Sequence, residues 1–291
     1  MHYAMRPRIN SKDRFLREIA FLKKLKPSYM WRGELVHAII AEVLSKSRFR
    51  KITLAQASKA LDSSGKRYWD DSLERAESKN PKSKLGSDAP IIMEHYYKDL
   101  DDKLDILDIL DLARHQLTNF FQWAEEKSLF ELLDRSSRNW IDPPVYIPSS
   151  PGFMVDDVKF ITKVDLALES SNFSIFDWKT SKNPKGAFHK SSEYRQTSFY
   201  ALWPHLEMSH ELENIDIRII YIGGSKPNEY SFTISPHDVD ALLADAELLV
   251  RASAELLKPD NDFTLEDFDW ATSARYCQWC PFQQICQREL S

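Results

Sequence analysis

Apolar and polar residues alternate in two stretches near the middle of the chain, and a short polar turn separates them. The stretches cover residues 160–169 and 173–179, both rich in Val, Ile, Phe and Leu, with Ser170-Ser171-Asn172 between them. This pattern predicts an antiparallel β-hairpin whose three-residue turn is centred on Ser171. One face of the predicted hairpin is apolar and should pack against a core: Val164, Leu166, Leu168, Phe176 and Trp178.

The other face carries charged residues at the open end of the hairpin. Facing residues are equidistant from Ser171, so Asp165 should lie opposite Asp177, and Lys163 opposite Lys179. Facing carboxylates repel each other on a sheet, so this pair indicates a bound divalent cation. Mg²⁺ prefers hard oxygen ligands, and a neighbouring lysine would stabilise charge developing on a phosphate. The alternative is an ordinary solvated strand face, because D-x-K tripeptides are frequent by chance.

The rest of the pattern predicts helices first and a mixed α/β region afterwards. Residues 10–134 are expected to be mostly helical, with one long apolar segment over 91–133. Asp142-Pro143-Pro144 and the Pro- and Ser-rich residues 148–152 mark the change to strands. The later elements are predicted as a helix from Ser191 that ends by Pro204, strands over 215–222 and 229–234, and a helix over 236–257.

Two predicted helices and the loop before the second carry further candidate residues. The first helix begins at Arg32-Gly33 and places His37 among apolar residues, where a histidine is more often a core residue than a ligand. On the second helix, Gln196 and Tyr200 lie one turn apart and share a face. The basic loop before that helix contains Lys182 and Lys185 and should face a phosphate-containing ligand.

Together these segments resemble the PD-(D/E)XK nuclease superfamily and, within it, the RecB-type branch. The resemblance lies in Asp165 followed by Asp177-Trp178-Lys179, in the Arg32-to-His37 helix, and in the Gln196 and Tyr200 pair. It implies an α/β fold with a restriction-endonuclease-like core, a mixed central sheet flanked by helices, and a large helical N-terminal part. The implied organisation is one nuclease domain over 1–291, with a helical insertion at 49–140, a catalytic core at 141–258, and a cysteine segment at 259–291 that packs on the N-terminal helices.

The resemblance also implies a function, that of a divalent-metal-dependent deoxyribonuclease, expected to be an exonuclease on single strands or DNA ends. Repair, defence and mobile-element processing are all open contexts. Any helicase, recombination or defence partner would be a separate chain, because no helicase motif is present. The alternative is a non-catalytic, nuclease-derived module that binds nucleic acid. The implied residues are Asp165, Asp177 and Lys179 for catalysis; His37, Asp165, Asp177 and the Trp178 carbonyl for Mg²⁺ or Mn²⁺; and Gln196, Tyr200, Arg32, Lys182 and Lys185 for site support or DNA contact.

All three cysteines of the chain lie near its C-terminus, in a C-x2-C-x5-C run formed by Cys277, Cys280 and Cys286. This run resembles the tail of iron-sulfur members such as AddB-type and CRISPR-associated RecB-like nucleases, which implies a 4Fe-4S cluster. A full cluster needs a fourth ligand. An upstream cysteine, a different ligand type, or loss of the cluster with packing of the thiols are the open explanations.

Charge is divided unevenly along the chain, whose net charge is −5. Residues 1–51 hold 13 Lys and Arg against 4 Asp and Glu, so this part is net positive and the remainder strongly negative. A basic helix that includes Arg6 and Arg8 could follow a phosphate backbone, or be an ordinary solvated face. The absence of an apolar membrane span or signal pattern, and the clustered cysteines, predict a cytoplasmic protein that does not bind membranes.

Overall fold

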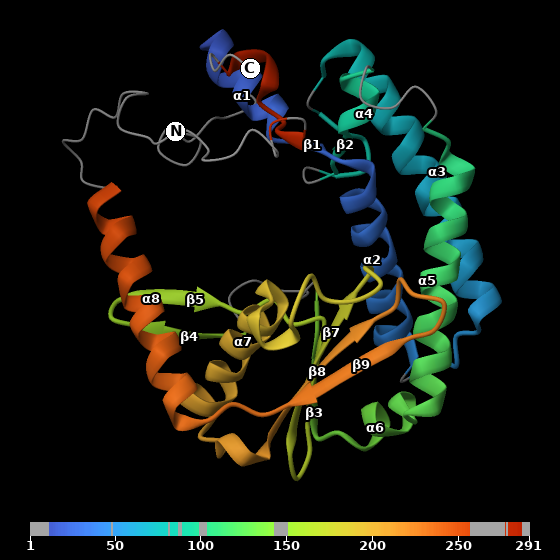
Figure 1. The fold of residues 1–291 in the computed structure, drawn as a ribbon. Helices are drawn as coiled ribbons and strands as arrows, with labels where there is room; N and C mark the ends of the chain where they lie inside the picture. Colours follow the sequence, from blue (N-terminus) through green and yellow to red (C-terminus); the bar gives the residue numbers. More distant parts are fainter. Residues whose placement is uncertain are drawn as a thin grey trace. The chain divides into compact units, whose positions relative to one another are not determined.

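The computed structural model describes residues 12–47, 49–80, 82–86, 89–98, 104–142, 151–256, 277 and 279–286 (Figure 1). The predicted basic positions Arg6 and Arg8, and most of the predicted segment 259–291, lie outside these residues. The chain forms two compact units. The first unit is Met1–Arg32, Asp62–Leu110 and Ala254–Ser291, and the second is Gly33–Leu61 and Asp111–Ser253.

The N-terminal part of the chain is mainly helical. Its elements are α1 (Arg14–Leu22), β1 (Leu25–Lys26), α2 (Ser28–Ser47), α3 (Leu54–Ser78), β2 (Ile91–Ile92), α4 (Met93–Tyr96), α5 (Ile106–Glu126) and α6 (Leu129–Arg135). The prediction of one continuous segment over 91–133 is wrong. Ile91 and Ile92 pair in parallel with β1 instead, and Asp105 accepts a hydrogen bond from the Leu107 backbone N–H at the start of α5.

The C-terminal cysteine segment packs within the first unit. Its side chains Phe282 and Ile285 contact a buried cluster that includes Phe21 and Leu22 of α1. Gln284 donates a hydrogen bond to Glu18 and accepts one from Tyr96, at 2.7 and 2.8 Å. Apolar burial and these two hydrogen bonds hold the segment.

A five-stranded mixed sheet forms the centre of the second unit. Its order is β3-β6-β7-β8-β9, with β7 parallel to β8 and every other pair antiparallel. The turn centred on Ser171 is confirmed, because Leu166 pairs with Phe176 and Glu169 with Phe173. The strands are β3 (Arg138–Ile141), β6 (Leu166–Glu169), β7 (Phe173–Lys179), β8 (Ile215–Tyr221) and β9 (Asn228–Phe232). β3 includes residue 140, where the predicted helical insertion ends, so the boundary falls inside a strand of the central sheet.

The predicted first strand of the hairpin, residues 160–169, is two strands in two sheets. Residue 160 belongs to β5 (Val158–Ile161), which pairs with β4 (Gly152–Val155) in a separate two-stranded sheet. The Thr162 N–H then bonds to the Pro151 carbonyl, and β6 begins only at Leu166. This break interrupts the alternation of side chains. Val164 therefore packs in the same cluster as Ala167 and Ile175, on the face opposite to the one predicted.

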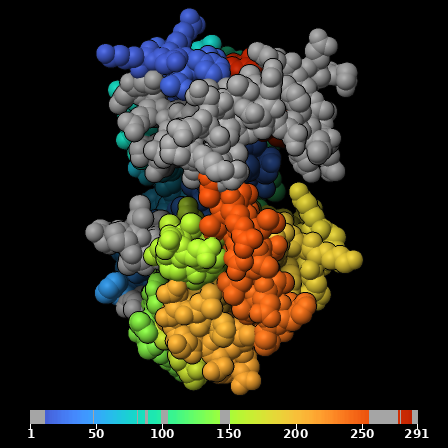
Figure 2. All heavy atoms as spheres, turned by 90° about the vertical axis from the view of Figure 1, so that its left-hand side faces the viewer, coloured from blue at the N-terminus to red at the C-terminus, as the bar shows by residue number. Residues whose placement is uncertain are grey.

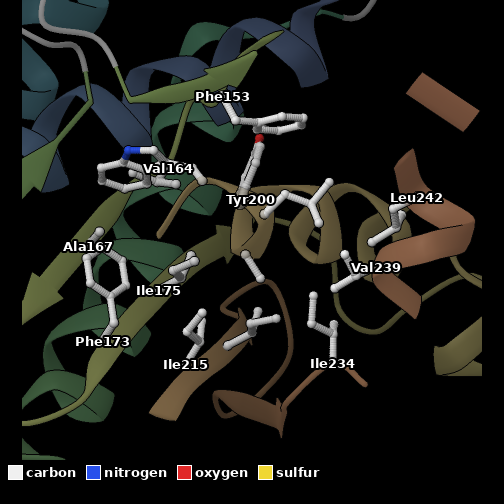
Figure 3. Packing of buried hydrophobic residues seen from close by; sticks show 14 of the residues in the cluster. Phe153, Val164, Ala167, Phe173, Ile175, Tyr200, Ile215, Ile234, Val239 and Leu242 are labelled. Atoms are coloured by element: carbon white, nitrogen blue, oxygen red, sulfur yellow. The ribbon is translucent and has the colours of Figure 1, made fainter. Parts of the chain in front are cut away.

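Hydrophobic residues cover both faces of the central sheet. On one face, α7 (Ser192–Met208) and α8 (Pro236–Leu256) contribute to a cluster with the sheet (Figure 3). On the other face, Phe176 and Trp178 contact the Trp123 ring of α5 at centroid distances of 5.9 and 5.2 Å. Their predicted core position is confirmed. Figure 2 shows α8, in orange, on the surface beside the light-green β4 and β5.

Helix α7 begins as predicted and continues further than predicted. The Ser191 hydroxyl caps it by accepting a hydrogen bond from the Tyr194 N–H. Pro204 lies inside the helix, which runs on to Met208, so the predicted end is wrong. Trp203 and Pro204 are both buried, and the packing of this turn offsets the backbone hydrogen bond that proline removes.

In the described part of the chain, none of the helices combines the length and apolarity needed to cross a bilayer.

Candidate active site

The open end of the β6–β7 hairpin brings Asp165 and Asp177 to neighbouring backbone positions. Asp165 lies one residue before β6, where continuing the register places it opposite Asp177. The backbone N–H of Trp178 donates a hydrogen bond to Asp165 Oδ2 at 2.7 Å. Asp177 is only 4% exposed. The hairpin thus fixes one carboxylate through the backbone and buries the other.

Helix α2 places His37 beside this hairpin. A Cβ atom on Gly33 would lie 3.1 Å from Thr180 Oγ1, so a glycine permits the close approach of α2 to the end of β7. One helical turn later, His37 Nδ1 lies 2.9 Å from Asp165 Oδ1 and donates a hydrogen bond to it. The predicted ligand histidine therefore faces the carboxylate rather than the hydrophobic core.

Lys179 connects the hairpin to α7 through a chain of polar contacts. Its Nζ atom lies 2.7 Å from Asp177 Oδ2 and donates a hydrogen bond to Gln196 Oε1 at 3.0 Å. Gln196 Nε2 in turn donates to the Tyr200 hydroxyl oxygen at 2.7 Å. The predicted Gln196 and Tyr200 pair is thus linked to Lys179, which orients the ammonium group.

Burial and neighbouring charges set the protonation of this cluster. Burial raises the pKa of Asp177 to about 6; Lys179 opposes this shift and Asp165 adds to it. Burial lowers the pKa of His37, but the carboxylates of Asp165 and Asp177 raise it more, so this pKa lies above its ordinary value. Burial also raises the pKa of Tyr200, which keeps its hydroxyl group neutral.

Polar side chains of α5 hold the ends of the two central strands. Gln116 Nε2 donates a hydrogen bond to the Thr180 carbonyl at 2.7 Å. Asn119 Nδ2 donates to the carbonyls of Ile222 and Gly224 at 2.9 and 2.8 Å. Both side chains are buried, so these bonds are shielded from water. Sequence reasoning missed these residues, because an amide on a helix resembles a solvent-facing position.

Asp142 is a third carboxylate near the hairpin that sequence reasoning treated only as a turn marker. Its backbone N–H donates to the Asp165 carbonyl at 3.3 Å, immediately after β3. Burial raises the pKa of Asp142, and the Asp165 charge raises it further. Its position at the end of a strand next to β6 was the available signal.

The donor set suits a hard divalent cation in kind. Carboxylate oxygens bind Mg²⁺ and Mn²⁺, and an imidazole nitrogen favours Mn²⁺ relative to a site made only of oxygens. Asp177 Oδ2 is buried and accepts no hydrogen bond of normal geometry from any described residue, although Lys179 is close. As the side chains lie, no three His, Cys, Asp or Glu residues among those described form a metal-holding group. Each oxygen of Asp165 accepts one hydrogen bond from the protein and keeps a second lone pair for an ion.

The chain matches the family model described as the PD-(D/E)XK nuclease superfamily over residues 12–287. The chain belongs to this superfamily. Members of the PD-(D/E)XK superfamily are generally nucleases and typically use divalent metals such as Mg²⁺ or Mn²⁺. The mixed α/β structure with its mixed central sheet is compatible with that fold.

Solved structures similar to this PD-(D/E)XK protein include one titled "Crystal structure of SSO0001". The two chains are 17% identical, with a TM-score of 0.31, and the similarity covers 67% of this chain and 78% of the other. No curated protein matches the chain.

The remaining predicted residues of this PD-(D/E)XK protein lie outside the polar contacts above. Lys182 and Lys185 are exposed in the loop after β7. Arg32 is half-buried, and among the described residues its Nε atom has no hydrogen-bond partner. Cys277 and Cys280 are half-buried and Cys286 is exposed, all with free thiols.

Proposed function

We propose that this protein is a divalent-metal-dependent deoxyribonuclease of the RecB-type branch that acts on single-stranded DNA or on DNA ends. One observation carries the proposal: Lys179 is held between the buried Asp177 and Gln196, beside the Asp165 and His37 pair. Membership of a nuclease superfamily supports the same reaction class.

Each side chain has a defined task in this proposal. His37, Asp165, Asp177 and the Trp178 carbonyl would hold Mg²⁺ or Mn²⁺, which would polarise the scissile phosphate and lower the pKa of a bound water. Lys179 places a positive charge where negative charge develops on the phosphate. Gln196 and Tyr200 keep that ammonium group in position through their two hydrogen bonds.

The test compares Asp177→Asn and Lys179→Ala with the wild-type protein on radiolabelled DNA in Mg²⁺ and in Mn²⁺. Each change should lower the cleavage rate by at least about 100-fold, because Asp177→Asn weakens the proposed metal site and Lys179→Ala removes the positive charge beside the phosphate. Lys163→Ala is the matched control, since Lys163 is an exposed lysine before the same hairpin. Undiminished cleavage by both variants would show that Asp177 and Lys179 do not carry the reaction, and wild-type protein that binds DNA without cleaving it would identify a non-catalytic binding module.

Metal binding has a readout that does not depend on cleavage. Mn²⁺ should raise the melting temperature of the wild-type protein, because a ligand that binds only the folded state stabilises it. Asp177→Asn should remove most of that shift, whereas Lys163→Ala should keep it. An equal Mn²⁺ shift in wild type and Asp177→Asn would show that the ion binds elsewhere.

The form of the substrate is tested with end-labelled linear duplexes, closed circles and single strands. An enzyme acting on ends or single strands should degrade the linear and single-stranded DNA and leave closed circular duplexes intact. Cleavage of the closed circles at the same rate would instead establish an endonuclease.

The cysteines do not fit an iron-sulfur cluster as they lie here. Three thiolates are one short of the usual four, and no three Cys, His, Asp or Glu side chains form a metal-holding group in the described residues. No step of the proposed reaction depends on them. Iron content and visible absorbance of anaerobically purified protein test the predicted cluster directly.

A further inference from the structure

Aromatic side chains gather around the loop that follows β7. Phe188 stacks on Tyr230 of β9, with ring centroids 4.3 Å apart and planes at 15°. Tyr194 lies 4.5 Å from Phe232, and His189 lies 5.1 Å from Tyr194. These five residues are called the aromatic patch. All of them lie in the second unit.

The aromatic patch is connected to the catalytic strand. β9 is an edge strand of the sheet, and Asn228 at its start donates a hydrogen bond to Asn183 of the loop at 3.1 Å. Tyr230 also contacts the ring of Tyr221 at 5.8 Å, and Tyr221 is the β8 residue paired with Lys179. Figure 2 shows the loop, in yellow, on the surface of this unit. The patch and Lys179 are therefore carried by neighbouring parts of one sheet.

The patch differs from an ordinary hydrophobic core. Phe188, Tyr194, Tyr230 and Phe232 are only half-buried, and His189 is exposed. Among the five, Phe232 packs against the buried cluster that includes Phe173 and Ile217. The rings thus contact mainly one another and keep part of their surface in water, where aromatic rings are available to a ligand.

The loop that carries Phe188 and His189 also carries positive charge. Lys182, Lys185 and Lys190 are all exposed, and none of them forms an ion pair with a residue that the structure describes. Arg195 is also exposed and pairs with Asp245 at 2.6 Å. Unpaired lysines beside half-exposed rings match a polymer with alternating phosphates and flat bases.

We infer that the aromatic patch is a base-stacking platform that guides single-stranded DNA toward Lys179. This inference rests on the proposed function and adds the residues that select its substrate. Every base offers a flat face to a ring, so such a platform binds strands without regard to sequence. In an intact duplex the base faces are already stacked on each other and are closed to the protein.

The test measures binding in EDTA, so that no cleavage occurs. The probes are an oligothymidylate of about 20 nucleotides, a strand of the same length in which abasic sites replace the bases, and a duplex. The variants are Phe188→Leu and Tyr230→Leu, which keep apolar bulk but remove the ring. Phe121→Leu is the control, because Phe121 is a half-buried ring of α5 that meets Phe120 edge-on and Phe130 at a tilt, and it is not part of the aromatic patch.

The expected result is a loss that depends on the bases. Each patch variant should bind oligothymidylate about 5- to 100-fold more weakly than wild type, the range expected for one lost stacking contact. Binding of the abasic strand should be unchanged, and Phe121→Leu should bind all probes like wild type. Melting temperatures show that each variant is folded, and Tyr194→Leu replaces any variant that is not.

Equal losses on the oligothymidylate and abasic strands would overturn the inference, since they would show that the rings only shape the loop. No loss on either strand would overturn it as well. If the wild-type protein cleaves DNA in a reaction that requires Lys179 but shows no base-dependent binding, the inference fails and the proposed function stands. A wild-type protein that neither binds nor cleaves DNA would contradict both.

Discussion

Two histidines, one in each unit, show how a partner decides the charge of the same side chain. His37 in the second unit donates to the Asp165 carboxylate, and its pKa lies above the ordinary value. His95 in the first unit lies 2.8 Å from the Ser72 hydroxyl and edge-on to Trp69, and burial lowers its pKa to about 4. The first environment favours a cation and the second a neutral ring.

The hydrogen bonds of Ser72 explain the neutral state of His95. The Ile92 backbone N–H donates to Ser72 Oγ at 2.7 Å, so the hydroxyl proton is directed to His95 Nδ1. The other ring nitrogen, Nε2, is buried and has no hydrogen-bond partner among the residues that are described. A second proton would place two donors face to face in a buried site. Carboxylate partners thus favour the charged form of His37, whereas a hydroxyl partner and an aromatic ring favour the neutral form of His95.

The largest effect expected from this contrast is acid destabilisation of the first unit. An unfolded histidine binds a proton near pH 6.5, whereas folded His95 stays neutral to about pH 4. Its contribution is therefore complete above pH 6.5 and falls as the pH decreases, by about 3 kcal/mol at pH 4. His95→Phe should remove most of this pH dependence of the unfolding free energy. Hydrogen exchange of residues 64–97, followed in urea at a series of pH values, measures it.

His210, in the second unit, provides a control for the His95 variant. His210 lies 3.3 Å from the Glu169 carboxylate in the second unit, so His210→Gln should leave the acid sensitivity of the first unit unchanged. If His95→Phe and wild type lose stability in parallel down to pH 4, His95 is not the responsible group.

The next largest effect should follow from breaking the contact between Lys179 and α7. Gln196→Leu removes both hydrogen bonds of the amide, so Lys179 loses its orientation while keeping its charge. We expect kcat to fall about 10- to 100-fold with little change in KM, the usual cost of removing such a supporting group. Steady-state cleavage of single-stranded DNA measures both constants.

Two further variants bracket that prediction. Tyr200→Phe removes only the hydroxyl group and should lower kcat less than Gln196→Leu does. Gln122→Leu, at an exposed glutamine that bonds to Glu126, should have no effect. A rise in KM at constant kcat for Gln196→Leu would mean that Gln196 binds substrate instead of orienting Lys179.

A smaller effect is expected at Asn119, a neutral amide that bonds to the chain just after β8. Asn119→Ala removes the side-chain donor from the Ile222 carbonyl, while His115 Nε2 still lies 2.7 Å from the Gly224 carbonyl oxygen, so the change should cost about 1–3 kcal/mol of unfolding free energy. Thr118→Ala, at the exposed neighbouring position, should cost under about 0.5 kcal/mol. Urea titration compares the two, and equal losses would show that Asn119 contributes only as a helix residue.

The smallest effect should come from the thiols. Apolar side chains and Gln284 hold the C-terminal segment, so replacing Cys277, Cys280 and Cys286 together with serine should change stability by under about 1 kcal/mol. Ile285→Ala should cost more, because it removes packing against the cluster of Phe21 and Leu22. About four irons per wild-type chain, with a large loss of stability in the serine variant, would instead establish the predicted cluster.

The sequence predicted the features that depend on local periodicity. The turn centred on Ser171 set the register of β6 and β7, and the one-turn spacing of Gln196 and Tyr200 placed both on one face of α7. Features that depend on distant partners were missed. The Thr162 N–H bonds to the Pro151 carbonyl, outside the β6–β7 hairpin. The buried Asn119 side chain donates to the Ile222 carbonyl, which is far away in the sequence.

Gly223 restricts how this protein can admit an ion. A Cβ atom there would lie 2.2 Å from the Thr180 carbonyl oxygen and under 3 Å from the Ser181 backbone, so the ends of the two central strands are in direct contact. Any side chain at this position would force the two strand ends apart. In the proposed site, rotation of the His37 and Lys179 side chains would admit an ion without moving the strand ends, and such rotation is far faster than backbone rearrangement.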